Sequence, residues 1–189
     1  IERPGDVDVF QFRGLAGNQI VAEVRARRLN SPLDSLLRLT DSAGKVLAWN
    51  DDNVLKDSHL HRDMMGLVTH HADSYVMAEL PSAGTYYVQL TDSQHHGGQA
   101  YAYRLRVSEP QPDFSLRVTP SSLQMLSSQI VPISVHVLRQ DGFAGEIEVA
   151  LENAPGFKLS GNRIPADSER VRMTLISPPE RPKKIVTLN

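Results

Sequence analysis

The sequence predicts an all-β protein built from two antiparallel β-sandwich domains. Three observations lead to this expectation: apolar and polar residues alternate in short runs, turn segments separate the runs, and a proline-containing polar stretch divides the chain. Period-two alternation places one face of a strand against a core and the other toward water. No stretch keeps apolar residues at helical spacing over a dozen positions, so we expect no long helix.

The strands of the first half are predicted by runs that are separated by turns. The turns are Asp41–Gly44 and Pro81–Gly84, each ending in a glycine that can adopt the positive φ of a tight reversal. Each turn should join or precede a strand. The alternating runs cover residues 20–26, 37–39, 46–48, 86–90 and 101–107.

A domain boundary is predicted near residue 110. The segment Ser108–Asp113 holds two prolines and little to bury, which is typical of an extended linker. The first domain then covers residues 1–109 and the second 110–189. Alternation restarts at 114–118 and continues at 131–137, 147–151 and 171–175, so the second domain should also be a sandwich. Its length is below the ~100 residues of an immunoglobulin domain, and the apolar run 185–188 is compatible with a truncated terminal strand.

Composition excludes several classes of function. The net charge is −2, which provides no basic field for nucleic acid or an anionic membrane. The chain has no cysteine, so a disulfide framework, a thiolate metal site and a cysteine nucleophile are excluded together. No apolar run reaches the ~18 residues of a membrane span, so no membrane insertion is expected. Because the chain opens at Ile1 without methionine, we expect a piece of a longer protein.

Short motifs in the first half follow one another in a recognisable order. They are Pro4–Phe12, the glycines Gly14 and Gly17, Leu33–Leu39, Asp41–Gly44, Ala83–Leu90 and Tyr101–Val107. Together they resemble the bacterial pre-peptidase C-terminal family over residues 4–107. The segment 138–149 is similar to bacterial immunoglobulin-like repeats, and residues 50–74 form an insert longer than is usual for the first family.

The resemblance implies a fold and a role. Members of the pre-peptidase C-terminal family are compact antiparallel sandwiches attached to secreted bacterial proteases and other exported enzymes. The implied role is accessory, in substrate or surface binding, targeting or spacing, on a secreted or cell-surface protein. Its partners would be a protein or polysaccharide surface ligand and the other domains of the same polypeptide.

An acidic segment is a candidate calcium site. Residues 49–53 read Trp-Asn-Asp-Asp-Asn, and such loops provide the oxygen ligands that Ca²⁺ requires. The spacing is not that of an EF-hand. The alternative is that these side chains cap turns and bind their own backbone. The candidate calcium ligands are Asp34, Asp51, Asp52, Asp57 and Asp73.

Histidines in the insert are candidate zinc ligands. His59 and His61 would lie on one face of a strand, with Asp57 or Asp63 nearby. The alternative is a pair of solvated surface histidines, because no zinc-spacing motif is present.

Two aromatic residues are candidate ligand-binding side chains. Trp49 and Tyr87 alternate against inward neighbours, so both are expected to point outward, where aromatic rings bind ligands at small entropic cost. The alternative for Trp49 is that it closes the edge of the sandwich.

The sequence favours a non-catalytic accessory module. No G-x-S-x-G motif is present, and Ser58 beside His59 and Asp57 is adjacent in sequence, which is not how catalytic triads assemble. Two alternatives stay open: a metal-dependent enzyme centred on the insert 50–74, and a purely structural spacer.

Overall fold

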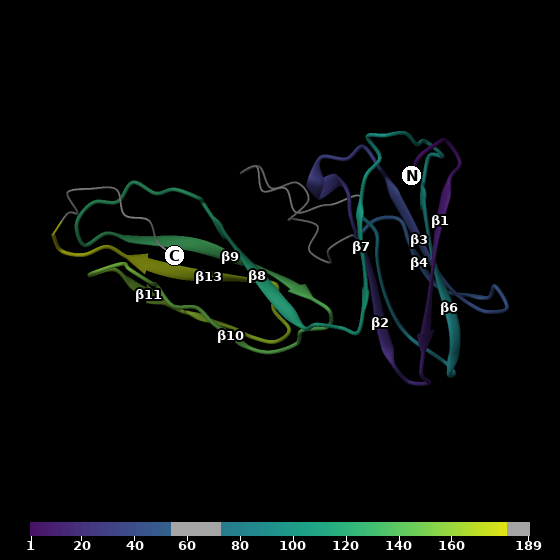
Figure 1. Ribbon diagram of the computed structural model, residues 1–189. Coiled ribbons are helices and arrows are strands. Elements are labelled where there is room, and N and C mark those ends of the chain that lie inside the picture. The colour runs from purple at the N-terminus through teal and green to yellow at the C-terminus, as the bar shows by residue number, and fades with distance from the viewer. Residues whose placement is uncertain (54–72, 181–189) are drawn as a thin grey trace. The chain divides into compact units, whose positions relative to one another are not determined.

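The chain divides into two compact units. The computed structural model describes residues 1–53 and 73–180, and the division falls between Ile1–Gln111, called unit 1, and Pro112–Asn189, called unit 2 (Figure 1). Regular structure in the described residues is almost entirely strand, and the helical element among them is the short 3-10 turn η1 (Arg27–Leu29). The predicted all-β antiparallel sandwich fold is confirmed. No helix among the described residues is long and apolar enough to cross a membrane.

Unit 1 contains two antiparallel sheets. The four-stranded sheet has the order β1 (Val7–Gly14), β6 (Gly84–Asp92), β3 (Ser35–Asp41), β4 (Val46–Asn50). The three-stranded sheet has the order β5 (Tyr75–Glu79), β2 (Gln19–Arg25), β7 (Arg104–Ser108). Strands β3 and β6 are paired although they lie far apart in the sequence, so residues of distant segments meet on one sheet face.

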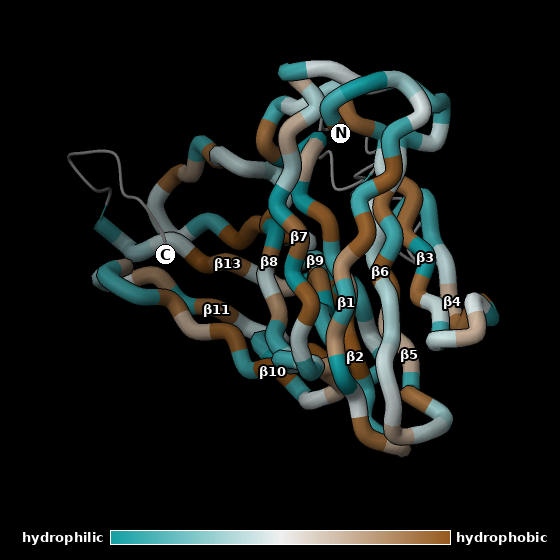
Figure 2. Tube along the Cα trace, turned by 45° about the vertical axis from the view of Figure 1, so that its right-hand side comes forward, coloured by the Kyte–Doolittle hydropathy of each residue, from teal (hydrophilic) through white to brown (hydrophobic). Residues whose placement is uncertain are grey.

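The core of unit 1 is filled by alternate residues of its strands. Figure 2 shows hydrophobic and hydrophilic positions alternating along these strands, as the period-two pattern predicted. Tyr86 at the centre is 1% exposed, stacks on Phe12, and donates a hydrogen bond from its hydroxyl to the Ser82 carbonyl. Other buried members of this core are Ile20, Ala22 and Val24 of β2, Leu37 and Leu39 of β3, Val76 of β5, and Val88 and Leu90 of β6.

The two predicted turns of unit 1 differ in their backbone. Asp41 begins the first turn, where its carboxylate accepts hydrogen bonds from the backbone N–H groups of Ala43 and Lys45, and Gly44 has a φ of +80°. This turn joins β3 to β4. In the second turn Gly84 is already the first residue of β6 and its φ is not positive, so the expectation for this glycine is wrong. The Tyr86 hydroxyl stabilises that turn instead.

Unit 2 is also antiparallel. Its larger sheet has the order β11 (Lys158–Ser160), β13 (Arg170–Ile176), β9 (Ile130–Gln140), β8 (Asp113–Thr119), and β10 (Ile147–Glu148) pairs with β12 (Arg163–Ile164). Its buried core residues are Ile133, Val135, Val137, Ile147, Ile164, Met173 and Leu175. The apolar run 185–188 lies outside the described residues, so a truncated terminal strand stays a prediction.

Candidate functional site

The two aromatic candidates lie on the same side of the four-stranded sheet of unit 1. Trp49 on β4 is directly opposite Arg38 on β3, and Arg38 is opposite Gln89 on β6. Tyr87 on β6 lies two residues along the strand from Gln89, opposite Thr40 on β3, in the next row of paired residues on this face. Directly paired residues project to the same face of a sheet. Trp49 and Tyr87 therefore share a face, separated across the sheet by about 10 Å, which is two strand spacings.

The rest of this surface follows from the strand register. Core residues such as Leu37 and Leu39 point inward, so the residues alternating with them point to the opposite side. We call this side the Trp49 face. Its members are Val7, Val9, Gln11 and Arg13 of β1, Thr85, Tyr87, Gln89 and Thr91 of β6, Leu36, Arg38 and Thr40 of β3, and Val46 and Trp49 of β4.

The Trp49 face mixes polar side chains with exposed apolar ones on its two edge strands, β1 and β4. Trp49 is 62% exposed and Val9 55% exposed. Thr40 is only 4% exposed although it lies on the same face, between its strand partners Val46 and Tyr87. The Trp49 of this structure thus projects outward and does not close the sandwich.

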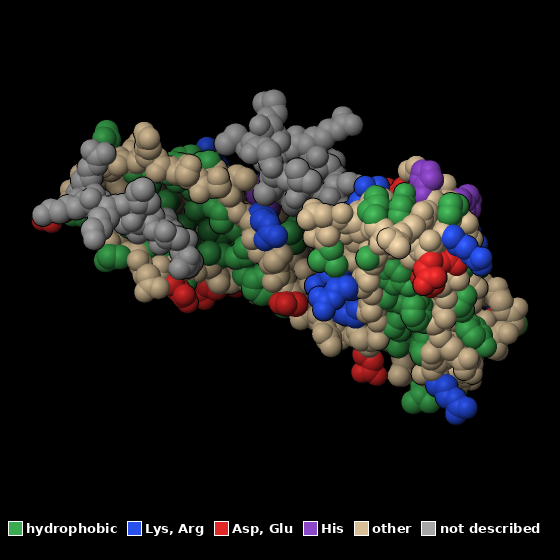
Figure 3. Space-filling model, turned by 45° about the horizontal axis from the view of Figure 1, so that its top comes forward, with side chains coloured by type: hydrophobic (Ala, Val, Ile, Leu, Met, Phe, Trp, Pro, Cys, Tyr) green, Lys and Arg blue, Asp and Glu red, His purple; other side chains and the backbone are tan. Residues whose placement is uncertain are grey.

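The charged members of the Trp49 face are both arginines. Arg13 and Arg38 are exposed, and the other members as defined above carry no charge. On the surface that Figure 3 shows, basic and acidic side chains form small separate groups. The Trp49 face therefore has a weakly positive character on a chain whose net charge is −2.

Asp73, one of the calcium candidates, is completely buried and is surrounded by hydrogen-bond donors. Its Oδ1 accepts bonds from the backbone N–H groups of Ala26 and Arg27, at 2.9 and 2.7 Å. Its Oδ2 accepts bonds from the backbone N–H and the Nε of Arg28, at 3.3 and 2.8 Å. The carboxylate thus ties the chain just before β5 to the turn that follows β2. It caps a turn, as the alternative to calcium expected, but this turn is distant in the sequence and is not the backbone of Asp73 itself.

The other acidic candidates are distributed over different environments. Asp34 accepts hydrogen bonds from the Ser93 hydroxyl and the Gln94 amide. Asp51 is exposed, and the carbonyl of Asp52 accepts a bond from the Asn50 amide. Asp57, His59 and His61 lie outside the described residues. In the described ranges, 1–53 and 73–180, no three His, Asp or Glu side chains are grouped so that they could hold a metal ion.

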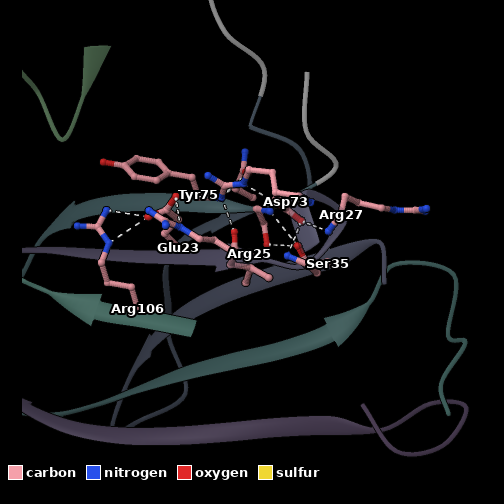
Figure 4. Close-up of polar contacts among 12 residues, drawn as sticks. Glu23, Arg25, Arg27, Ser35, Asp73, Tyr75 and Arg106 are labelled. Atoms are coloured by element: carbon pink, nitrogen blue, oxygen red, sulfur yellow. Dashed lines mark hydrogen bonds and ion pairs between the residues drawn. The ribbon is translucent and has the colours of Figure 1, made fainter. Parts of the chain in front are cut away.

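Next to Asp73 lies an ion-pair network that the sequence analysis did not single out. Glu23 Oε1 is 2.9 Å from Arg28 Nη2, and Glu23 Oε2 is 3.0 Å from Arg106 Nη2 (Figure 4). Arg28 thus joins Glu23 to Asp73, because its Nε is paired with the second carboxylate. Glu23 and Arg106 are paired in register on β2 and β7, so their proximity follows from the sheet order and not from any local motif.

Both chain segments that flank residues 54–72 are held to the body of unit 1. The Asn50 side chain accepts a hydrogen bond from the Tyr75 backbone N–H, which joins the end of β4 to the start of β5. The Ser35 hydroxyl accepts a bond from the Ser74 backbone N–H. With Asp73, these contacts fix the described chain on both sides of residues 54–72.

The stability of unit 1 is expected to fall in acid because of Asp73. Burial alone would raise the pKa of Asp73, but the hydrogen bonds from the Arg28 side chain and from three backbone N–H groups lower the pKa below its ordinary value of 3.8. A lowered pKa in the folded state stabilises the fold above pH 3.8, and this stabilisation is lost as the pH falls through the folded-state pKa. Urea unfolding between about pH 6 and about pH 2.5 should show the loss. An Asp73→Asn variant should have a shallower dependence over the same range, and an unchanged slope would contradict this role.

Comparison with known proteins relates part of the chain to a protease. No family model matches, so membership of the pre-peptidase C-terminal family stays a prediction. No solved structure matches either. A stretch of 90 residues, 47% of the chain, is 38% identical to a probable subtilase-type serine protease of Deinococcus radiodurans. The matched stretch spans about 10% of the length of that relative, so this stretch is homologous to a small part of a probable subtilase-type protease.

Proposed function

We propose that the chain is a non-catalytic accessory module of a secreted subtilase-type protease, and that it binds a protein or polysaccharide surface ligand through the Trp49 face. The observation that carries this proposal is the placement of Trp49 and Tyr87 on one open sheet face. The partial homology to a subtilase-type protease supports the association with such an enzyme.

The Trp49 face is suited to binding and offers no catalytic machinery. Exposed apolar surface is costly in water, and contiguous exposed patches commonly mark interaction sites. The face combines an indole, a phenol and aliphatic side chains with the amides of Gln11 and Gln89. Its members as defined above include no histidine, aspartate or glutamate that could act as a general base.

Replacing Trp49 by alanine is expected to weaken ligand binding about 30-fold, because a hot-spot aromatic side chain contributes about 2 kcal/mol or more to a binding interface. The measurement is depletion of the full chain from solution by insoluble cellulose, chitin, calcium pectate, peptidoglycan and collagen. We expect at least one polymer to retain the chain through Trp49.

The matched control is Leu15→Ala. Leu15 is 65% exposed, follows β1 and does not belong to the Trp49 face. This variant should bind as tightly as the unmodified chain. Equal binding by the two alanine variants, or no retention by any of the five polymers, would overturn the proposal.

A further inference from the structure

Arg38 occupies the centre of the Trp49 face. It lies on β3, between Trp49 of β4 and Gln89 of β6, and Tyr87 and Thr40 form the next row. The side chain is exposed, and no ion pair to Arg38 is formed by the residues that the structure describes. This differs from Arg28 and Arg106, which are paired with Glu23. Within residues 1–53 and 73–180, the Arg38 guanidinium therefore has no charged partner.

The surroundings of Arg38 restrict the chemistry of that ligand. An arginine fork binds a carboxylate through two parallel charge-assisted hydrogen bonds. The amides of Gln11 and Gln89 and the hydroxyl of Thr91 can both donate and accept hydrogen bonds, as sugar hydroxyls require of a partner. The flat indole of Trp49 offers an apolar surface to the face of a ring.

We propose that the ligand of the Trp49 face is a uronate-containing polysaccharide, in which a carboxylate pairs with Arg38 while a neighbouring sugar ring packs on Trp49. The inference rests on the binding function proposed above and adds the chemical class of the ligand. The charge of the face is complementary to such a polymer, because Arg38 and Arg13 are its two charged members.

A polysaccharide fits this surface better than an acidic peptide does. Domains that recognise peptides commonly use a sheet edge, a groove or a pocket, whereas Arg38 lies in the middle of a sheet face. A sulfated polymer such as dextran sulfate carries more charges per sugar than a uronate polymer, and would require more cations than the two of this face. Neutral hydrogen-bonding side chains around a single central cation match a chain that is rich in hydroxyl groups.

The test compares polymers that differ in charge. Binding of the full chain is measured by isothermal titration calorimetry with polygalacturonate, its methyl ester, polyglutamate and dextran sulfate. We expect tightest binding to polygalacturonate and about tenfold weaker binding to the methyl ester, which keeps the sugar backbone and removes the charge. Binding to polygalacturonate should weaken as sodium chloride is raised, since exposed charges are screened by salt.

The matched variants are Arg38→Gln and Arg104→Gln. Arg38→Gln should weaken polygalacturonate binding about tenfold and leave methyl-ester binding unchanged. Arg104 is exposed on β7 of the other sheet, so Arg104→Gln should bind as the unmodified chain does. Thermal unfolding of both variants checks that the fold is retained.

The outcomes separate this inference from the proposed function. Equal affinity for the acid and the ester, or no effect of Arg38→Gln, would overturn the role of charge while the binding function stands. Tighter binding to polyglutamate than to polygalacturonate would show that the ligand is not a polysaccharide. Tighter binding to dextran sulfate would show that its charged group is not a uronate carboxylate. If none of these four polymers binds and chitin or collagen retains the chain through Trp49, the inference fails and the proposed function survives.

Discussion

Replacing Asp73 by alanine is expected to lower the free energy of unfolding of unit 1 by about 4 kcal/mol, because it breaks a network of four hydrogen bonds to a buried carboxylate and leaves the buried backbone N–H of Ala26 without its acceptor. Asp73 is completely buried. The change would remove the acceptor of three backbone N–H groups and of Arg28 Nε in one step. Isolated unsatisfied donors each carry a penalty of their own.

Urea unfolding followed by tryptophan emission measures this loss in the correct unit, since Trp49 is the single tryptophan of the chain and belongs to unit 1. The control is Asp51→Ala in a buffer containing EDTA, because Asp51 is exposed and EDTA removes any calcium. We expect no measurable change for the control. A loss below about 1 kcal/mol for Asp73→Ala would show that the four hydrogen bonds do not hold β5 in place.

Replacing Tyr86 by alanine should also destabilise unit 1 by about 4 kcal/mol, since truncation of a large buried aromatic side chain removes its burial energy and leaves a cavity. The ring is 1% exposed and its centroid is 5.7 Å from that of Phe12. Tyr86→Phe isolates the hydroxyl, which donates to the Ser82 carbonyl at 2.6 Å. We expect this smaller change to cost about 1 kcal/mol.

The neighbouring residue provides the control for Tyr86. Tyr87 points to the Trp49 face, so Tyr87→Ala should change the stability by less than about 1 kcal/mol. The same urea experiment reports on all three variants. If Tyr86→Ala and Tyr87→Ala proved equally destabilising, the assignment of inward and outward faces on β6 would be wrong.

The strands with clean alternation were predictable from the sequence. Residues 20–26, 37–39 and 86–90 lie in or overlap β2, β3 and β6, which supply most of the core of unit 1. Strands β1 and β5 were not predicted from alternation. In β1 the consecutive apolar residues Val9 and Phe10 are both exposed, so apolar and polar residues do not alternate strictly along this strand. Tyr101 and Tyr103 precede β7 but still pack against the core. The alternating run 101–107 therefore begins before the strand does.

The candidate site was only partly predictable. Trp49 and Tyr87 lie on the outward positions that alternation predicted, but Val46, which was expected to point inward, shares the face of Trp49 because of a register shift in the pairing of β3 with β4. The common face of Trp49 and Tyr87 depends on the pairing of β4 with β3 and of β3 with β6. Arg38 could be recognised as a candidate ligand-binding residue only after the strand order had placed it beside Trp49. The environment of Asp73 could not be predicted from the sequence either, because its hydrogen-bond donors are 45 to 47 residues away along the chain.

The most direct test of the binding proposal is acrylamide quenching of Trp49, the chain's one tryptophan. Quenching is measured for the full chain alone and with each polymer that depletes it from solution. Because Trp49 is 62% exposed, the free chain should be quenched efficiently, and a ligand on the Trp49 face should protect the indole. Retention of the chain by a polymer with unchanged quenching would place the ligand on another surface and contradict the account.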